Sequence, residues 1–176
     1  MATNVVFQIL YKDYYARVFG LCRRILNSPT LAEDATQEAF MRAYKKFDSY
    51  DDTQPFWQWI ATIANHHCID LLRQRGRTKS LFGEEVAEVE TLESADIALE
   101  SQVITSENGV ALNVAIAALP DKYRVPLVLA YFFEASYEQI AEDLSINQNH
   151  VGVLLLRAKQ MLRSTMIDAD RQGVNK

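Results

Sequence analysis

Residues 136–163, SYEQIAEDLSINQNHVGVLLLRAKQMLR, decide the fold of this 176-residue chain, because they predict two short helices joined by a turn. Ser136 with Gln139 three residues later fits a capping box, and Asn147 can cap the second helix. The pattern is typical of a helix-turn-helix, which makes DNA the first partner to consider, although any two amphipathic helices joined by a short turn produce it as well. Apolar residues recur at three- and four-residue steps on one face of each helix, namely Ile140, Ala141 and Leu144, then Val151, Leu155, Ala158 and Leu162.

The first part of the chain also predicts helices, and no stretch alternates as a strand does, so we expect an all-α protein. Asn27-Ser28-Pro29 breaks the first helix, and Thr30 with Glu33 fits a second capping box. Pro55 then stands where a helix start tolerates proline. The expected helices cover residues 7–26, 30–47 and 56–75.

The net charge of −5 is unevenly distributed along the chain. Residues 1–79 carry 11 Lys and Arg against 8 Asp and Glu, residues 80–107 carry none against 8, and residues 108–176 carry 7 of each. The acidic stretch has too few large apolar residues to build a core, so it is either a charged tether or a polyanion that imitates nucleic acid. We therefore expect two small helical domains, residues 1–77 and 108–176, joined by an acidic linker at residues 78–107.

Several other classes of protein are excluded at this level. No apolar run reaches the roughly 18 residues of a membrane span, and the first residues lack a signal-peptide layout, so we expect a cytoplasmic protein. Cys22 and Cys68 fit buried thiols better than a disulfide framework. His66, His67 and Cys68 are adjacent and point in different directions on a helix, so we expect neither a metal nor another cofactor. We find no phosphate loop and no nucleophile with a base, and we expect no enzyme.

Two surfaces of the first part suggest partners. In the helix from Thr30, alanines and phenylalanines gather on one side, and the opposite side is either a solvated face or a dock for a basic protein surface. Tyr50 and Trp57 flank a polar loop and are backed by arginines, a combination that can stack on unpaired bases and hold phosphates. The acidic side consists of Glu33, Asp34, Gln37, Glu38 and Met41.

The order of these motifs resembles a known family. Residues 32–77, AEDATQEAFMRAYKKFDSYDDTQPFWQWIATIANHHCIDLLRQRGR, resemble the second conserved region of the extracytoplasmic-function (ECF) sigma factors of the sigma-70 family. Residues 118–162, ALPDKYRVPLVLAYFFEASYEQIAEDLSINQNHVGVLLLRAKQML, resemble the fourth region, which carries the helix-turn-helix. The resemblance implies a protein that binds core RNA polymerase, recognises promoter DNA and helps to melt it.

The resemblance also implies roles for particular residues. The acidic side of the helix from Thr30 would dock on the coiled coil of the largest polymerase subunit, and the acidic linker would imitate RNA near the exit path. The loop would capture a flipped base of the −10 element, and a pocket would be needed to offset the few kcal/mol that flipping costs. The residues implied at the −10 element are Tyr50, Asp51, Asp52, Thr53, Trp57, Gln58, Asn65, His66, Arg73 and Arg75.

The chain departs from the family in two places. After the valine at position 151 the family usually has Lys-Ser-Arg-Leu-His-Arg-Ala-Arg, whereas here Gly152, Leu154 and Leu156 replace polar or basic residues. Trp57 and His66 stand where the family often has arginine and asparagine, which puts the −10 base preference in doubt. The donors left for the −35 element are Gln148, Asn149, His150, Arg157, Lys159 and Arg163.

We therefore expect weak or altered −35 recognition, and an apolar strip at Gly152, Val153 and Leu156. Either a partner covers this strip, an anti-sigma factor or a DNA-bound recruiter, or the strip touches DNA or packs locally. Two alternatives to a sigma factor remain at this point: an adaptor recruited through the last helix, and a free-standing helix-turn-helix regulator.

Overall fold

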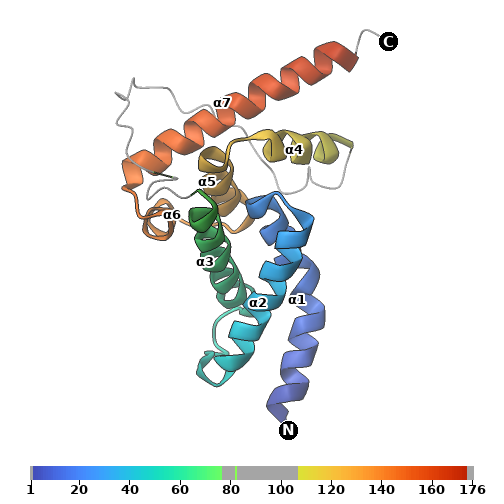
Figure 1. Cartoon of the computed structure of the whole chain (residues 1–176), viewed down its shortest axis with the longest axis vertical. Coiled ribbons are helices and arrows are strands. Elements are labelled where there is room, and N and C mark those ends of the chain that lie inside the picture. Colours follow the sequence, from blue (N-terminus) through green and yellow to red (C-terminus); the bar gives the residue numbers. More distant parts are fainter. Residues whose placement is uncertain (1, 77–81, 83–106, 174–176) are drawn as a thin grey trace. The chain divides into compact units, whose positions relative to one another are not determined.

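The structure is a computed structural model and describes residues 2–76, 82 and 107–173. Over these ranges the chain forms seven α-helices, one 3-10 helix and no strand, which confirms the expected all-α class (Figure 1). The chain divides into two compact units, Met1–Lys79 and Ser80–Lys176. Most of the predicted acidic linker lies outside the described residues, so the linker stays a prediction.

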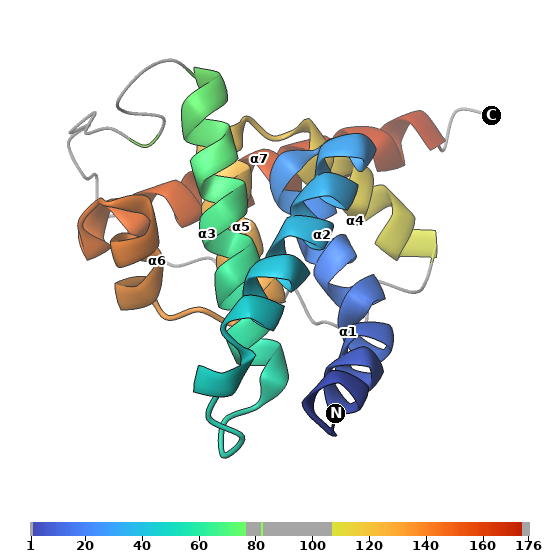
Figure 2. The same ribbon diagram turned by 60° about the horizontal axis from the view of Figure 1, so that its bottom comes forward.

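Three α-helices make up the first unit: α1 (Ala2–Leu26), α2 (Pro29–Lys45) and α3 (Phe56–Gly76). Each packs against the other two. Figure 2 shows α2 beside both α1 and α3. The contacting faces are formed by apolar side chains that are fully buried, and small alanines on α2 let the helix axes approach closely. This core contains Val18, Cys22, Ile25, Ala32, Ala35, Ala39, Ile60, Ala64 and Cys68.

The predicted capping box at Thr30 and Glu33 is wrong. Helix α2 begins one residue earlier, at Pro29, and its N-cap is Ser28, whose hydroxyl accepts a hydrogen bond from the Leu31 amide. Ser28 has an extended backbone, and proline fits the first helical position because its missing N–H would have no partner there. Helix α2 also ends at Lys45, earlier than expected, and a 3-10 helix, η1 (Phe47–Ser49), follows it.

Four helices make up the second unit: α4 (Glu107–Ala118), α5 (Asp121–Phe132), α6 (Tyr137–Leu144) and α7 (Gln148–Gly173). Helix α7 packs against the other three, and α5 also contacts α6. The apolar stripes predicted from the sequence form much of this core, which contains Ile116, Val125, Leu127, Leu129, Ile140, Leu144, Val151, Leu155, Ala158 and Leu162.

The turn between α6 and α7 has the predicted caps. The Ser136 hydroxyl accepts from the Gln139 amide at 3.1 Å, and the Gln139 side chain accepts from the Ser136 amide at 2.9 Å. The Asn147 side chain accepts from the His150 amide at 2.7 Å. Between them, Ser145 adopts a left-handed conformation (φ 57°) and the Ile146 amide donates to the Ala141 carbonyl, which closes α6 in a Schellman-type end. Three residues therefore connect the two helices.

Candidate nucleic-acid interface

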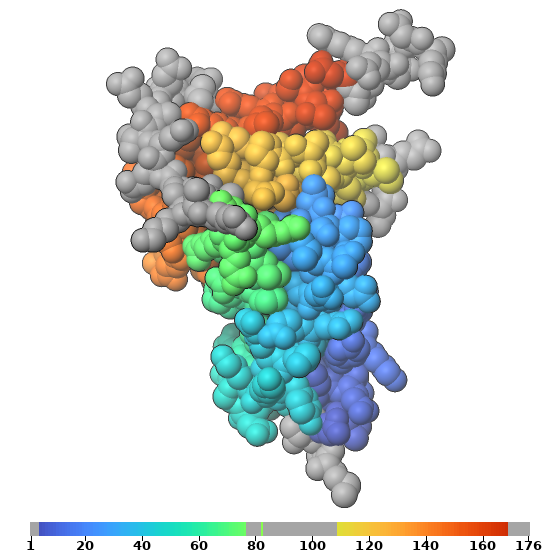
Figure 3. Space-filling model, in the orientation of Figure 1, coloured from blue at the N-terminus to red at the C-terminus, as the bar shows by residue number. Residues whose placement is uncertain are grey.

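Helix α2 has the two faces that the sequence predicted. Its alanines and Phe40 are buried, whereas Glu33, Asp34 and Gln37 are exposed and the Met41 side chain is 54% exposed. Glu38 is half-buried and forms an ion pair with Arg42 at 2.6 Å, one helical turn later. The hydrogen bond from Arg42 lowers the pKa of the Glu38 carboxyl, so that this carboxylate is ionised at neutral pH. The acidic side is therefore largely exposed. Figure 3 shows α2, in lighter blue to cyan, at the molecular surface.

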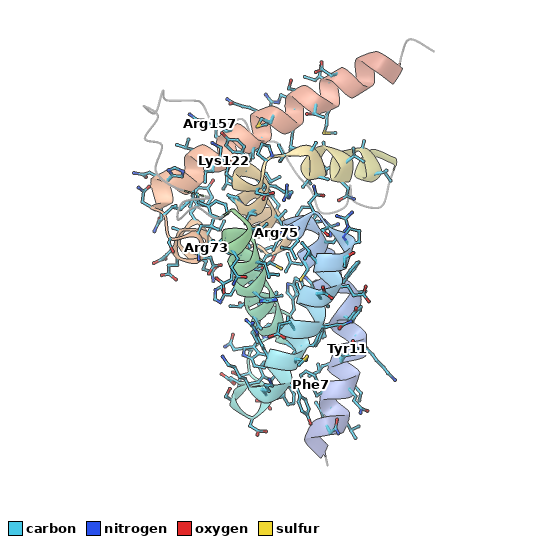
Figure 4. All side chains as sticks on the ribbon, viewed as in Figure 1. Phe7, Tyr11, Arg73, Arg75, Lys122 and Arg157 are labelled. Atoms are coloured by element: carbon cyan, nitrogen blue, oxygen red, sulfur yellow. The ribbon has the colours of Figure 1, made fainter. Side chains whose placement is uncertain are left out.

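An apolar depression of about 470 Å³ borders this surface between α1 and α2. Phe7 and Tyr11 line it from α1, and Figure 4 labels both. Phe40, Met41 and Tyr44 line it from α2, together with the edges of Gln37 and Lys45. This depression was not predicted from the sequence. It is lined by aromatic residues on two helices, and two of them, Tyr11 and Tyr44, stay partly exposed although they are large.

The loop between η1 and α3 is held in one conformation by its own polar groups. The Asp51 carboxylate accepts from the Thr53 amide at 3.0 Å and from the Thr53 hydroxyl at 2.7 Å. The Gln54 amide donates to the Asp51 carbonyl at 3.1 Å, which closes a turn. The two bonds from Thr53 lower the pKa of the Asp51 carboxyl. Asp51, Asp52 and Thr53 are exposed.

Tyr50 lies at the start of this loop, within a cluster of aromatic rings. Its ring centroid lies 4.9 Å from that of Trp59, which is half-buried. Phe47 and Phe56 complete the ring's surroundings at centroid distances of 5.8 and 5.6 Å. Trp59 is therefore an aromatic side chain beside the loop. It was not among the −10 residues predicted from the sequence.

The structure contradicts the placement of Trp57 and Asn65 on an open single-strand surface. Trp57 is 8% exposed, and the Arg17 guanidinium lies 3.8 Å from the centroid of its ring. The indole thus pairs with a cation from α1 instead of offering a face to a base. Asn65 is fully buried, and among the described residues its side-chain amide has no hydrogen-bond partner.

The remaining −10 candidates lie along α3. Gln58 and His66 are exposed, and with a step of about 100° per residue they share one face with Arg73, whereas Arg75 points to a different side. Arg73 is half-buried, with a guanidinium nitrogen 3.9 Å from Asp70. Figure 4 labels Arg73 and Arg75 near the C-terminal end of α3. The structure therefore brings only part of the predicted set onto one surface.

In the second unit, α7 presents the candidate −35 residues in two groups. With a step of about 100° per residue, one side of α7 carries Gln148, Asn149, Lys159 and Arg163. The other two candidates, His150 and Arg157, lie on nearly the opposite side of the helix. The Lys159 ammonium lies 5.4 Å from the centroid of the Tyr131 ring. This cation–π contact orients the ammonium group and leaves its positive charge in place.

The apolar strip predicted on α7 is only partly exposed. Leu154 is 4% exposed, so this replacement extends the core of the second unit. Gly152, Val153 and Leu156 are half-buried and not fully exposed. Only Gly152 and Leu156 fall on the same side of α7 as Gln148 and Lys159. A side chain at position 152 would have its Cβ 3.8 Å from the Tyr137 ring, an ordinary contact distance.

Two further findings limit the chemistry of the described residues. No group of three or more His, Cys, Asp or Glu side chains in the described ranges is arranged to hold a metal ion. None of the helices in that part of the chain is long and apolar enough to cross a membrane.

Two parts of the chain match families of known proteins. Residues 10–78 match the sigma-70 region 2 family and residues 110–162 match sigma-70 region 4. The ECF RNA polymerase sigma factor SigW of Bacillus subtilis is 36% identical, over 90% of this chain and 86% of that protein. The chain belongs to the ECF sigma factors. SigM of the same organism, another ECF sigma factor, is 26% identical over 99% of both chains.

Two solved structures share the fold of this ECF sigma factor. A sigma factor RpoE in complex with the anti-sigma factor NepR from Bartonella quintana has a TM-score of 0.58 and 20% identity, covering 91% of this chain and 96% of that one. CnrH in complex with the cytosolic domain of CnrY has a TM-score of 0.53 and 20% identity, covering 95% of this chain and 90% of that one. The family consists of transcription initiation factors, so this protein is not an enzyme. It binds core RNA polymerase and directs promoter recognition.

Proposed function

We propose that this ECF sigma factor docks on core RNA polymerase through the acidic side of α2 and reads the −10 element with the loop after η1. The observation that carries the proposal is the position of Glu33, Asp34 and Gln37, which are exposed opposite a fully buried alanine face. A rigid helix holding carboxylates in solvent suits a basic partner surface, because charge complementarity speeds association and fixes orientation. Such a sigma factor acts in the cytoplasm, where core polymerase is found.

The proposed −10 surface is smaller than the sequence suggested. It consists of Asp51, Asp52 and Thr53 in the loop and Gln58 and His66 on α3, with Trp59 beside them. Arg73, on the same face of α3, supplies positive charge for the phosphates, whereas Arg75 lies on another side of the helix.

For the −35 element we propose that α7 enters the major groove with Gln148 and Asn149 first. Amide side chains at the start of a recognition helix can read adenine, and Lys159 and Arg163 can hold phosphates further along. Leu156 contributes only an apolar contact, so we expect weaker −35 discrimination than a helix with a basic residue there would give. The family membership favours neither the free-standing regulator nor the adaptor.

The docking surface can be tested by charge reversal. We expect Glu33→Lys with Asp34→Lys to weaken binding to bacterial core RNA polymerase by at least about tenfold, which corresponds to about 1.4 kcal/mol. Fluorescence anisotropy of the labelled sigma factor against core polymerase measures the affinity at fixed salt.

The matched control is Asp13→Lys with Asp48→Lys, which changes the charge equally at exposed carboxylates outside the α2 face. It should keep wild-type affinity within about twofold, because surface charges away from an interface contribute little. Equal losses in both variants would reduce the effect to net charge and remove α2 as the docking surface.

A further inference from the structure

Tyr50 connects the two ends of the loop proposed to capture the base. Its hydroxyl donates a hydrogen bond to the backbone carbonyl of Gln54 at 2.5 Å, across the whole loop. Burial raises the pKa of the hydroxyl, and the Asp52 carboxylate raises it further, so that the hydroxyl stays protonated and can donate at neutral pH. Side chain and backbone thus close a ring around residues 51–53.

The Tyr50 ring is itself held in place. It stacks on Phe47 with an interplanar angle of 17° and meets Phe56 edge-on at 89°. Trp59 packs against it at 39°. A ring fixed by three neighbours has lost its rotational freedom on folding, so its hydroxyl is aimed at Gln54 without further entropic cost. The same packing leaves Tyr50 poorly placed to stack on an incoming base.

We propose that Tyr50 is a positioning residue, whose hydroxyl clasps the loop and presents Asp51, Asp52 and Thr53 to a flipped promoter base in one fixed conformation. This inference rests on the proposed −10 function of the loop. It replaces the expectation that Tyr50 itself captures the base.

The physical reason is preorganisation. Fixing the backbone of each loop residue costs conformational entropy, and a loop that is already closed does not lose this freedom again when it binds DNA. The internal bonds of Asp51 and Thr53 act in the same direction, but they fix only the middle of the loop. The Tyr50 hydroxyl is the group that joins residue 50 to residue 54.

The test removes only the hydroxyl. Holoenzyme is assembled from bacterial core RNA polymerase and either wild-type sigma factor or Tyr50→Phe, and is presented with a library of short single-stranded DNA of random sequence. Sequencing of the bound fraction gives the base preference at each position. Because one hydrogen bond is worth about 0.5–1.5 kcal/mol, we expect the preference at the captured base to fall by about two- to tenfold.

The matched control is Gln54→Ala, which removes an exposed side chain but keeps the carbonyl that accepts the bond. It should keep the wild-type preference. Hydrogen exchange of the free sigma factor provides a second measurement: the amides of Thr53 and Gln54 should exchange faster in Tyr50→Phe, while those of α1 and α2 stay as protected as in wild type.

The outcomes distinguish failure of the clasp, meaning the hydrogen bond from the Tyr50 hydroxyl to the Gln54 carbonyl that fixes the loop, from failure of the proposed −10 function. A Tyr50→Phe holoenzyme with wild-type base preference and wild-type loop exchange overturns the clasp. If Tyr50→Phe weakens DNA binding equally whichever of the four bases stands at the captured position, the hydroxyl has only a general stabilising role. The proposed positioning role of Tyr50 is then rejected as well. If wild-type holoenzyme enriches no sequence beyond what core polymerase enriches alone, the proposed −10 function fails.

Discussion

At the scale of single residues, the two cysteines show how burial decides chemistry. Cys22 of α1 and Cys68 of α3 are both fully buried, as the sequence predicted, and they lie in the core with Thr36 of α2. The hydrogen bond with Cys22, together with burial, raises the pKa of the Cys68 thiol far above its ordinary value. A thiol that cannot ionise is a poor nucleophile, so Cys68 is a packing residue.

Both sulfur atoms are shielded from solvent, so we predict that both thiols react only slowly while the first unit is folded. Iodoacetamide should label both cysteines in denaturant and, in native protein at pH 8, do so more than about a hundredfold more slowly, since reaction requires opening of the core. Mass spectrometry of quenched samples counts the labels. Rapid labelling of native protein would mean that the α1–α3 contact opens far more readily than its packing indicates.

At the scale of elements, the start of α6 is fixed by two reciprocal bonds, whereas the start of α2 has one weak bond. The Ser136 and Gln139 pair lies within ordinary hydrogen-bond distances, but Ser28 is 3.5 Å from the amide it serves. The better geometry belongs to the short helix, which has only eight residues and few internal hydrogen bonds of its own.

We predict that Ser136→Ala destabilises the second unit by about 1 kcal/mol and that Ser28→Ala costs the first unit less. Urea unfolding followed by circular dichroism measures both. Ser164→Ala, at an exposed position inside α7, is the control and should change stability by less than about 0.5 kcal/mol. An equal cost at Ser28 and Ser136 would show that bond geometry does not set the strength of these caps.

At the scale of the whole molecule, each compact unit has its own core. Cys22, Ile25 and Ile60 are fully buried in the first unit, and Leu127, Ile140 and Leu162 are fully or almost fully buried in the second. Separate cores suit a protein that must contact both polymerase and promoter DNA, since each unit can bind without unfolding the other.

We predict that fragments 1–79 and 107–176 each unfold cooperatively when produced alone. Their far-ultraviolet spectra should add up to the helical signal of the intact chain, apart from the contribution of residues 80–106. Circular dichroism during heating tests this, with the intact chain as reference. A fragment without a cooperative transition would show that its core depends on the rest of the chain.

Local sequence predicted the helical elements and the caps around the turn between α6 and α7. The helical class, the capping box at Ser136, the cap at Asn147 and the two faces of α2 all depend on residues within four positions of one another. Such interactions are local, so spacing along the chain predicts them. The wrong cap, Thr30 in place of Ser28, came from choosing between two neighbouring residues that can both cap a helix.

Tertiary structure alone decided which aromatic and polar side chains stay available. Arg17 covers Trp57 from another helix, and Leu154, at a position where the family usually has a basic residue, is buried in the core of the second unit. Tyr50 is held by Phe56 and Trp59, which lie beyond the loop. These partners are brought together only when the helices pack, so helical periodicity along the sequence could place each residue on a face but could not show what that face would meet.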